Sequence, residues 1–279
     1  INFISFTGSN EVGVLVQQAA AKNVIKCVLE LGGKSPLIVL DDANVDEAVK
    51  AAVFGSFLYQ GQICMSTERL VVDEKVADEF VSKFAARAKE LQMDDPSKNP
   101  GCIIGPMINP TSGPRINDMI NDALKKGAKI VCGGVADGAV MPATILDHVD
   151  SSMQIYDEET FGPITVIVRV KSTEEAIEVA NDSAYGLSSG VFGRNVNRAL
   201  AVAMEAGQKH PLALSLMRAA QVDSISIPNL SDPVINLLGK GLSSGVYRLG
   251  SATWLGIRSD AQAGQYGQVH LADDEGLIA

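Results

Sequence analysis

The sequence predicts an α/β protein built on a mostly parallel sheet that helices cover on both faces. Short apolar segments that end at Gly, Pro or polar residues alternate with longer segments whose apolar residues recur at helical spacing. Several of the short segments, such as residues 35–40 and 162–170, are apolar almost without interruption. Such runs are typical of strands that are buried on both faces of a parallel sheet.

The predicted elements follow one another from the first residue to about residue 207. Strands are expected where β-branched and apolar residues end at a turn signal, at residues 1–8, 25–33, 35–40, 68–74, 128–134, 141–149, 162–170 and 188–193. Helices are expected at residues 9–23, 41–61, 75–91, 113–127, 172–183 and 195–207. Ser9 or Asn10 should cap the first helix, and a loop rich in Pro and Gly occupies residues 93–110.

Beyond residue 207 the alternation weakens. Pro211 interrupts an otherwise helical segment, and Pro228 and Pro233 break the segment that follows. The last residues show no clear period, so residues 236–279 are expected to be irregular.

The composition bounds the class of protein. The chain has 279 residues, of which 46% are hydrophobic, and it can therefore bury a substantial core. A net charge of −10 and a pI near 4.8 argue against binding to nucleic acid, which needs clustered positive charge. No apolar run reaches the roughly 18 residues of a transmembrane helix, so no association with a membrane is expected.

The cysteines and histidines are few and isolated. The four cysteines do not form a disulfide framework, which indicates a reducing compartment, and we expect the cytoplasm. Without a His-Glu-x-x-His motif or a Cys/His cluster, no metal site is predicted. The chain starts with Ile1 inside a strand, so we expect it to be truncated at its start, and N-terminal targeting is left open.

The stretch FTGSNEVG, residues 6–13, combines a strand end, a glycine turn and a helix start. Backbone N–H groups at such a turn, together with the helix dipole, suit a phosphate group. The stretch lacks both the lysine of a P-loop and the GxGxxG spacing. An ordinary turn between strand and helix is the alternative.

The stretch LELGGKSP, residues 29–36, places Glu30 in an apolar strand directly before two glycines. A carboxylate in such surroundings is costly unless it is paired or solvated. Glu30 is therefore either a strand-end side chain that reaches solvent or a general base.

The stretch QGQICMSTER, residues 60–69, contains Cys64 where a helix gives way to a strand. A free cysteine is often a small buried hydrophobe. Gly61, however, permits close approach of the backbone, and a partly open junction is what a nucleophilic cysteine requires.

The stretch YDEETFGPI, residues 156–164, is either a solvated acidic patch or a binding site. As a site, Glu159 would bind a ligand hydroxyl group and Phe161 would flank a flat ring. The sequence GLSSG, at 186–190 and 241–245, matches GxSxG, but neither copy has the strand–turn–helix context of a serine hydrolase.

Taken together and in this order, the four stretches resemble the aldehyde dehydrogenase superfamily. Glu30 and Cys64 stand 34 residues apart, which is similar to the family's separation of general base and nucleophile. MPATIL, at 141–146, and NDSAYGLSSGVFGRN, at 181–195, are also typical of its catalytic domain. The sequence GQICMSTER most resembles that of the branch that acts on aromatic aldehydes such as salicylaldehyde and vanillin.

The resemblance implies oxidation of a small aldehyde with NAD or NADP as cofactor. The Cys64 thiolate would attack the aldehyde, its backbone N–H would help to hold the oxyanion, and Glu30 would activate the water that hydrolyses a thioester. The residues implied to bind the cofactor are Gly8, Ser9 and Gly13 at the pyrophosphate, Leu31 and Gly32 beside the nicotinamide, Glu159 at its ribose and Phe161 near its ring. Full-length relatives are implied to be homo-oligomers, and the state of this chain is left open.

The resemblance also divides the chain. Residues 1–30 would be a remnant of a Rossmann-type NAD(P)-binding domain, and residues 31–235 would form the catalytic domain, with an atypical segment at about 208–221. Residues 236–279 would be a divergent C-terminal segment. Because the family's oxyanion asparagine and adenosine-ribose lysine would lie before Ile1, we expect an incomplete, weakly active or inactive enzyme. A non-enzymatic remnant and a cofactor-independent esterase are the alternatives.

Overall fold

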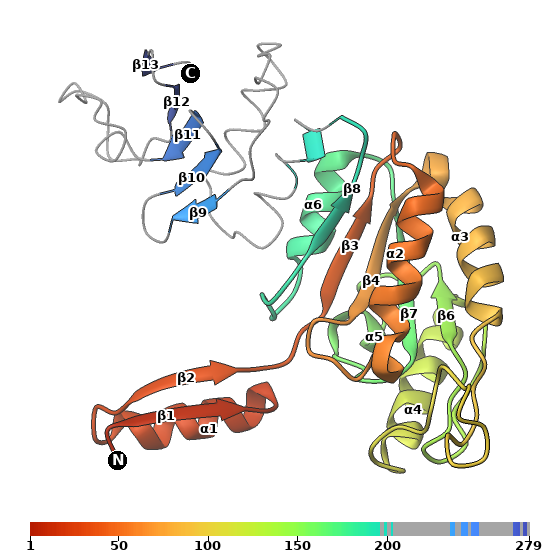
Figure 1. The fold of residues 1–279 in the computed structure, drawn as a ribbon. Coiled ribbons are helices and arrows are strands. Elements are labelled where there is room, and N and C mark those ends of the chain that lie inside the picture. Colours follow the sequence, from red (N-terminus) through yellow and green to blue (C-terminus); the bar gives the residue numbers. More distant parts are fainter. Residues whose placement is uncertain are drawn as a thin grey trace. The chain divides into compact units, whose positions relative to one another are not determined.

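The structure is a computed structural model, and it forms two compact units, Ile1–Gly207 and Gln208–Ala279. The residues that it describes are 1–195, 198–199, 202, 235–237, 241–244, 247–250, 270–273 and 276–277. Strands and helices alternate along the first unit, and its larger sheet is mostly parallel (Figure 1). The predicted α/β class is confirmed.

The first three elements form a small β–α–β arrangement. β1 (Phe3–Thr7) and β2 (Lys26–Glu30) pair in parallel, and α1 (Asn10–Ala21) connects them. Ser9 caps this helix, because its hydroxyl accepts a hydrogen bond from the N–H of Val12 at 3.4 Å. Of the two predicted caps, the structure selects the serine.

The larger sheet has six strands in the order β5-β6-β7-β4-β3-β8. Its neighbouring strands are parallel except for the antiparallel pair β5 and β6. The strands are β3 (Ser35–Val39), β4 (Thr67–Asp73), β5 (Lys129–Cys132), β6 (Thr144–Asp147), β7 (Ile164–Val170) and β8 (Gly190–Phe192). Five of the six lie within segments that the sequence predicts as strands, and β4 begins one residue before the predicted segment 68–74.

Helices cover both faces of this sheet (Figure 1). They are α2 (Val45–Phe57), α3 (Glu74–Lys89), α4 (Ser112–Lys125), α5 (Gln154–Asp157) and α6 (Thr173–Asn181). Ile167 of β7 packs into the core beneath α2 and α3, whereas its neighbours Val166 and Val168 pack into the core beneath α4. This alternation gives each face of the sheet its own apolar core.

The sequence did not predict α5, which is only four residues long and follows the loop after β6. The predicted helix at 195–207 and the atypical segment at 208–221 fall largely or wholly outside the described residues. In the second unit, where an irregular segment is expected, the described residues are short antiparallel strands in the order β13-β12-β11-β10-β9. They are β9 (Ile235–Leu237), β10 (Gly241–Ser244), β11 (Tyr247–Gly250), β12 (His270–Asp273) and β13 (Gly276–Leu277).

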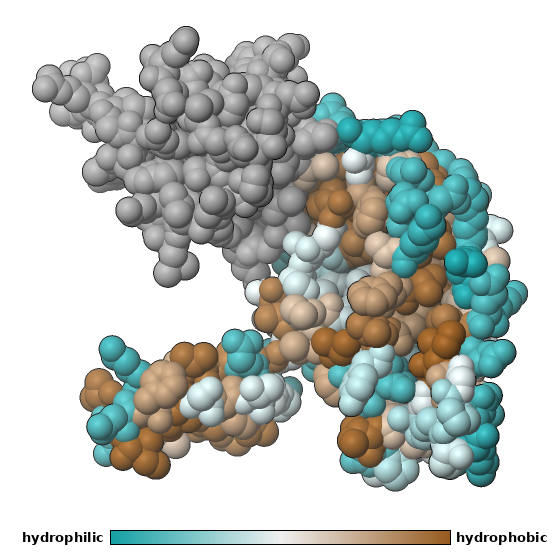
Figure 2. All heavy atoms as spheres, viewed as in Figure 1, coloured by the Kyte–Doolittle hydropathy of each residue, from teal (hydrophilic) through white to brown (hydrophobic). Residues whose placement is uncertain are grey.

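The surface is apolar over much of the first three elements (Figure 2). Phe3 is 53% exposed, Leu15 63% and Val24 91%. A search of the described residues for a helix long and apolar enough to span a bilayer gave none.

Asp41, just after β3, joins two other segments of the first unit. Its carboxylate accepts hydrogen bonds from Lys75 at the start of α3, at 2.8 Å, and from Arg198. These two hydrogen bonds lower the pKa of Asp41 from 3.8 to about 2. Because the pKa is lower in the folded chain, the stabilisation is present above about pH 4 and is lost as the pH falls through 2.

Asp41→Asn should therefore lower the free energy of unfolding at pH 6 by about 1 kcal/mol. This is less than the full pKa difference would give, because the Asp41 side chain is 25% exposed and solvent screens the pairs. The gap between parent and variant should narrow toward pH 3, as urea unfolding at both pH values would measure. Asp118→Asn, at an exposed position of α4, is the control, and an equal gap at both pH values would contradict the assignment.

Candidate functional site

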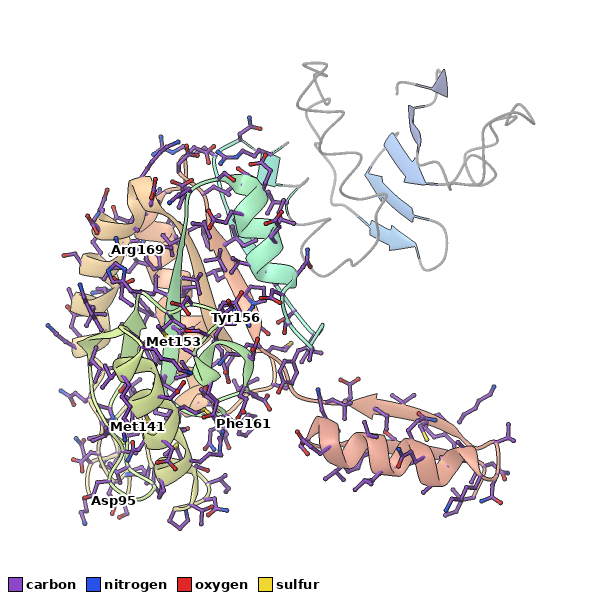
Figure 3. All side chains as sticks on the ribbon, turned by 180° about the vertical axis from the view of Figure 1, so that it is seen from behind. Asp95, Met141, Met153, Tyr156, Phe161 and Arg169 are labelled. Atoms are coloured by element: carbon purple, nitrogen blue, oxygen red, sulfur yellow. The ribbon has the colours of Figure 1, made fainter. Side chains whose placement is uncertain are left out.

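Three loops that precede adjacent strands lie at one end of the six-stranded sheet. Residues 31–34 precede β3, residues 62–66 precede β4, and residues 158–163 precede β7. Because β7, β4 and β3 are parallel neighbours, their preceding loops lie side by side. Phe161 lies at this end of the sheet, and Arg169, late in β7, lies at the other (Figure 3). Three of the four predicted stretches are thus brought together.

This site lies at the amino ends of the strands. In open parallel sheets, ligands usually bind outside the carboxyl ends. Sequence reasoning that follows the usual rule would therefore have looked at the opposite edge. Only the glycine-rich sequences of the loops point to the edge at the amino ends of the strands.

Cys64 lies in the turn between the short 3₁₀ helix Leu58–Gly61 and β4, and it is half-buried. Tyr59 and Gln60 both have positive φ, at 54° and 58°. Left-handed backbone in two consecutive bulky residues is strained, and such strain gathers at functional sites. Neither residue type signals a turn, so this conformation could not be predicted from the sequence.

The turn around Cys64 is closely packed against its neighbours. A Cβ atom on Gly61, which has φ +65°, would lie 2.1 Å from the carbonyl oxygen of Gly162. A Cβ atom on Gly33 would lie 2.4 Å from the carbonyl oxygen of Cys64. Both glycines are therefore needed for close approach of the backbone. Within the described residues, the backbone N–H of Cys64 has no hydrogen-bond acceptor.

Glu159 faces the two glycines that precede β3. Its Oε1 accepts a hydrogen bond from the N–H of Gly33 at 3.0 Å, and a Cβ atom on Gly32 would lie 2.5 Å from its Oε2. Burial raises the pKa of Glu159, and the hydrogen bond from Gly33 opposes that rise. Among the residues that the structure describes, Oε2 accepts no hydrogen bond, so it is available to a ligand.

Glu68 and Lys34 form a buried ion pair that the sequence analysis did not single out. Lys34 Nζ and Glu68 Oε2 are 2.7 Å apart, with side chains 0% and 3% exposed. Burial lowers the pKa of Lys34, and the charge of Glu68 opposes this. Glu68 also accepts hydrogen bonds from the N–H groups of Thr160 at 2.8 Å and Phe161 at 3.0 Å. The signal that could have identified the pair is its position, because Lys34 lies in LELGGKSP and Glu68 lies in QGQICMSTER.

Two arginines hold the loop before β7 and its surroundings. Arg115 of α4 donates hydrogen bonds to the carbonyl oxygens of Glu159 at 3.1 Å and Thr160 at 2.5 Å. Arg69, with a fully buried side chain, donates to the carbonyl oxygen of Tyr156 and lies 4.0 Å from the centre of its ring. The positions of Glu159 and Phe161 are therefore fixed from several sides.

The remaining predicted residues lie on the β–α–β arrangement. The N–H of Gly8 donates to the carbonyl oxygen of Glu30 at 3.0 Å. Gly13 packs against Leu31, whose Cδ2 would lie 2.6 Å from an added Cβ. Glu30 is the last residue of β2 and is exposed. No hydrogen bond links its side chain to Cys64 within the described part of the chain.

No group of three or more His, Cys, Asp or Glu residues that could hold a metal ion occurs within the described residues. This end of the sheet presents a thiol, carboxylates, the Lys34 ammonium group and backbone N–H groups.

Comparison with known proteins is consistent with this arrangement. The profile of the aldehyde dehydrogenase family matches residues 1–210. The chain belongs to the aldehyde dehydrogenase family. The family resemblance predicted from the four stretches is confirmed.

Two curated relatives act on aromatic aldehydes, as their names state. A salicylaldehyde dehydrogenase of Pseudomonas sp. (strain C18) is 64% identical over 223 residues, which cover 79% of this chain and 46% of the relative. A vanillin dehydrogenase of Pseudomonas fluorescens is 47% identical over 209 residues, which cover 74% of this chain and 43% of the relative. The chain thus spans about half the length of the curated relatives that it matches.

Solved structures give the same picture. A salicylaldehyde dehydrogenase from Pseudomonas putida G7, complexed with salicylaldehyde, matches with a TM-score of 0.72 and 67% identity. The match covers 74% of this chain and 42% of the chain of that structure. A glyceraldehyde-3-phosphate dehydrogenase from Bacillus halodurans C-125, complexed with NADP, has a TM-score of 0.71 and 36% identity over 75% of this chain and 43% of its own. PnpE, in complex with nicotinamide adenine dinucleotide, has a TM-score of 0.71 and 34% identity over 75% of this chain and 44% of its own.

Gly61→Ala should lower the free energy of unfolding by about 2 kcal/mol or more. The added Cβ would collide with the carbonyl oxygen of Gly162, and a left-handed backbone disfavours alanine. Gly134→Ala is the matched control, because a Cβ atom there meets nothing within 4 Å. Urea unfolding of both variants measures the difference, and equal stabilities would contradict the predicted collision.

Proposed function

We propose that this chain provides the nucleophile and the general base of an NAD(P)+-dependent oxidation of an aromatic aldehyde to the carboxylic acid. The observation that carries the proposal is the turn of Cys64. The thiol is half-buried, its backbone N–H has no acceptor within the described residues, and Gly33 approaches its carbonyl. The 64% identity to a salicylaldehyde dehydrogenase supports an aromatic substrate.

Cys64 would act as the nucleophile. Its thiolate would form a bond to the aldehyde carbon, and the resulting oxyanion would accept a hydrogen bond from the backbone N–H of the same residue. Loss of the carbon-bound hydrogen as hydride would leave a thioester on the Cys64 sulfur. The strained turn that leads to Cys64 supports this role, because backbone strain gathers at functional sites.

Glu30 would act as the general base. It would take a proton from a water molecule that attacks the thioester carbon, so that the acid leaves and the Cys64 thiolate is restored. Its exposed position at the end of β2, directly before the loop that reaches Cys64, supports access to water.

The residues present fit a dinucleotide cofactor. The start of α1 with Ser9, and the close packing of Gly13 on Leu31, are what a pyrophosphate at a helix N-terminus requires. At Glu159, the free Oε2, which lies against Gly32, suits a ribose hydroxyl. NAD(P)+, when bound, would accept the hydride. The same proposal places Phe161 beside the nicotinamide ring and Gly8 near the pyrophosphate.

The compartment and the alternative activity belong to the same proposal. The four cysteines are free, which supports a reducing compartment such as the cytoplasm. Cys64 and Glu30 alone would also suffice to hydrolyse an activated ester without cofactor. Hydrolysis of p-nitrophenyl acetate that is equally fast in Cys64→Ala would exclude that alternative.

The Cys64→Ala and Glu30→Gln variants test the two roles separately. With salicylaldehyde and NAD+ or NADP+, the parent should form NADH or NADPH, measured by absorbance at high protein concentration. Cys64→Ala should form none. Glu30→Gln should form the thioester but hydrolyse it slowly, so that mass spectrometry finds a salicyloyl group on the peptide that contains Cys64.

Heptanal, which has as many carbon atoms as salicylaldehyde, serves as the control substrate, and Glu79→Gln on the exposed face of α3 is the control variant. Absence of both reduced cofactor and acyl-Cys64 in the parent would overturn the proposed function. Equal rates with heptanal would overturn the aromatic specificity.

A further inference from the structure

The Glu68 carboxylate is the point at which the three loops of the site are joined. Glu68 is the second residue of β4 and lies only four residues after Cys64. Its Oε2 accepts hydrogen bonds from Lys34 Nζ at 2.7 Å and the N–H of Thr160 at 2.8 Å, and its Oε1 accepts from the N–H of Phe161 at 3.0 Å. One side chain thus contacts the loop before β3 and the loop before β7 from the start of β4.

The neighbours of these contacts are the residues assigned to the cofactor. Lys34 directly follows Gly33, whose N–H donates to Glu159. Thr160 and Phe161 directly follow Glu159 in the chain. The loop before β3 and the loop before β7 are therefore joined by a closed ring of contacts. Glu68 binds the backbone of the loop before β7, and the N–H of Gly33 binds the Glu159 side chain of that same loop.

The ring of contacts maintains an unusual backbone conformation at Phe161. Its φ is +48°, a left-handed conformation that is unfavourable for a bulky residue unless the surroundings impose it. The hydrogen bond from its N–H to Glu68 is a contact that can impose it. Without that acceptor, the N–H would lose its partner and the backbone could relax.

Only a carboxylate can accept the three hydrogen bonds and also balance the charge of Lys34. Three donors converge on it, and one of them is a cation whose side chain is 0% exposed. A carboxylate offers about four lone-pair sites and the balancing charge, whereas an amide offers one acceptor oxygen and adds donors. If Glu68 served only as the ion-pair partner of Lys34, it would not also need to accept hydrogen bonds from the backbone N–H groups of Thr160 and Phe161.

We propose that Glu68 is a positioning residue that fixes Glu159 and Phe161 for the nicotinamide end of the cofactor by binding the backbone N–H groups of Thr160 and Phe161. The proposal rests on the proposed function for its meaning in catalysis. The positioning itself is a property of the chain without cofactor.

The test uses the full chain and replaces both members of the pair. Lys34→Met/Glu68→Met removes both charges, so no buried charge is left unpaired, but it also removes the acceptor of the two N–H groups. Lys34→Met/Glu68→Gln keeps one acceptor oxygen. Hydrogen exchange, followed residue by residue, should be at least about tenfold faster at Thr160 and Phe161 in the Met/Met variant, with unchanged exchange at Leu70 and Val71 in β4. The Met/Gln variant should lie between it and the parent.

Titration with NAD+ provides the functional readout. The dissociation constant should rise about tenfold in Lys34→Met/Glu68→Met and less in the Met/Gln variant, while the control Glu79→Met should match the parent. If the parent itself shows no saturable binding of NAD+ or NADP+, the cofactor role in the proposed function fails, and hydrogen exchange alone decides the positioning.

Three results would overturn the positioning role. The first is exchange at Thr160 and Phe161 within twofold of the parent in the Met/Met variant. The second is equal acceleration throughout the sheet, which would indicate a general contribution to stability. The third is loss of folding in both double variants, which would assign the pair to the fold as a whole.

Discussion

The parallel alignment of β7, β4 and β3 is the constraint on which the site depends. Loops that are separated by more than ninety residues in the chain meet because the three strands are neighbours and start at the same edge. The edge at which they start presents backbone N–H groups: those of Gly33 and Phe161 donate to carboxylates, and that of Cys64 has no acceptor within the described residues. A carboxylate therefore finds backbone donors there, and at Glu68 the Lys34 side chain adds a third donor.

Burial of charge keeps this edge rigid. The Lys34–Glu68 pair is withdrawn from water, and a buried pair gains little over apolar side chains of the same size. Removal of one partner alone, however, commonly costs about 3–5 kcal/mol, because the other charge is left uncompensated. The pair thus contributes more to the choice of one loop conformation than to overall stability. Arg69 and Arg115 act in the same sense, because each binds carbonyl oxygens near the loop before β7.

Much of the fold followed from the sequence, because apolar periodicity and glycine turns are local signals. They located the six strands and the five longer helices within the described residues, and they narrowed the cap of the first helix to Ser9 or Asn10. The motifs also located Cys64, Glu30 and Glu159, whose roles stay predictions. The left-handed Tyr59 and Gln60, the short α5 and the role of Glu68 did not follow, since tertiary contacts impose them. The only local signal for Glu68 is its place in the stretch that contains Cys64, because the N–H groups that it binds are distant in the chain.

The β–α–β arrangement has a consequence for the lifetime of the two proposed catalytic groups. Glu30 belongs to a two-stranded sheet with exposed apolar side chains, whereas Cys64 adjoins a six-stranded sheet with a core on each face. Two-stranded sheets are marginally stable by themselves, and such segments open more often than a central sheet. On warming, the base would be lost before the nucleophile. Because Gly8, Ser9 and Gly13 lie on the same arrangement, the proposed pyrophosphate site would be lost together with the base, and the Cys64 thiol would be left without the hydride acceptor that thioester formation needs.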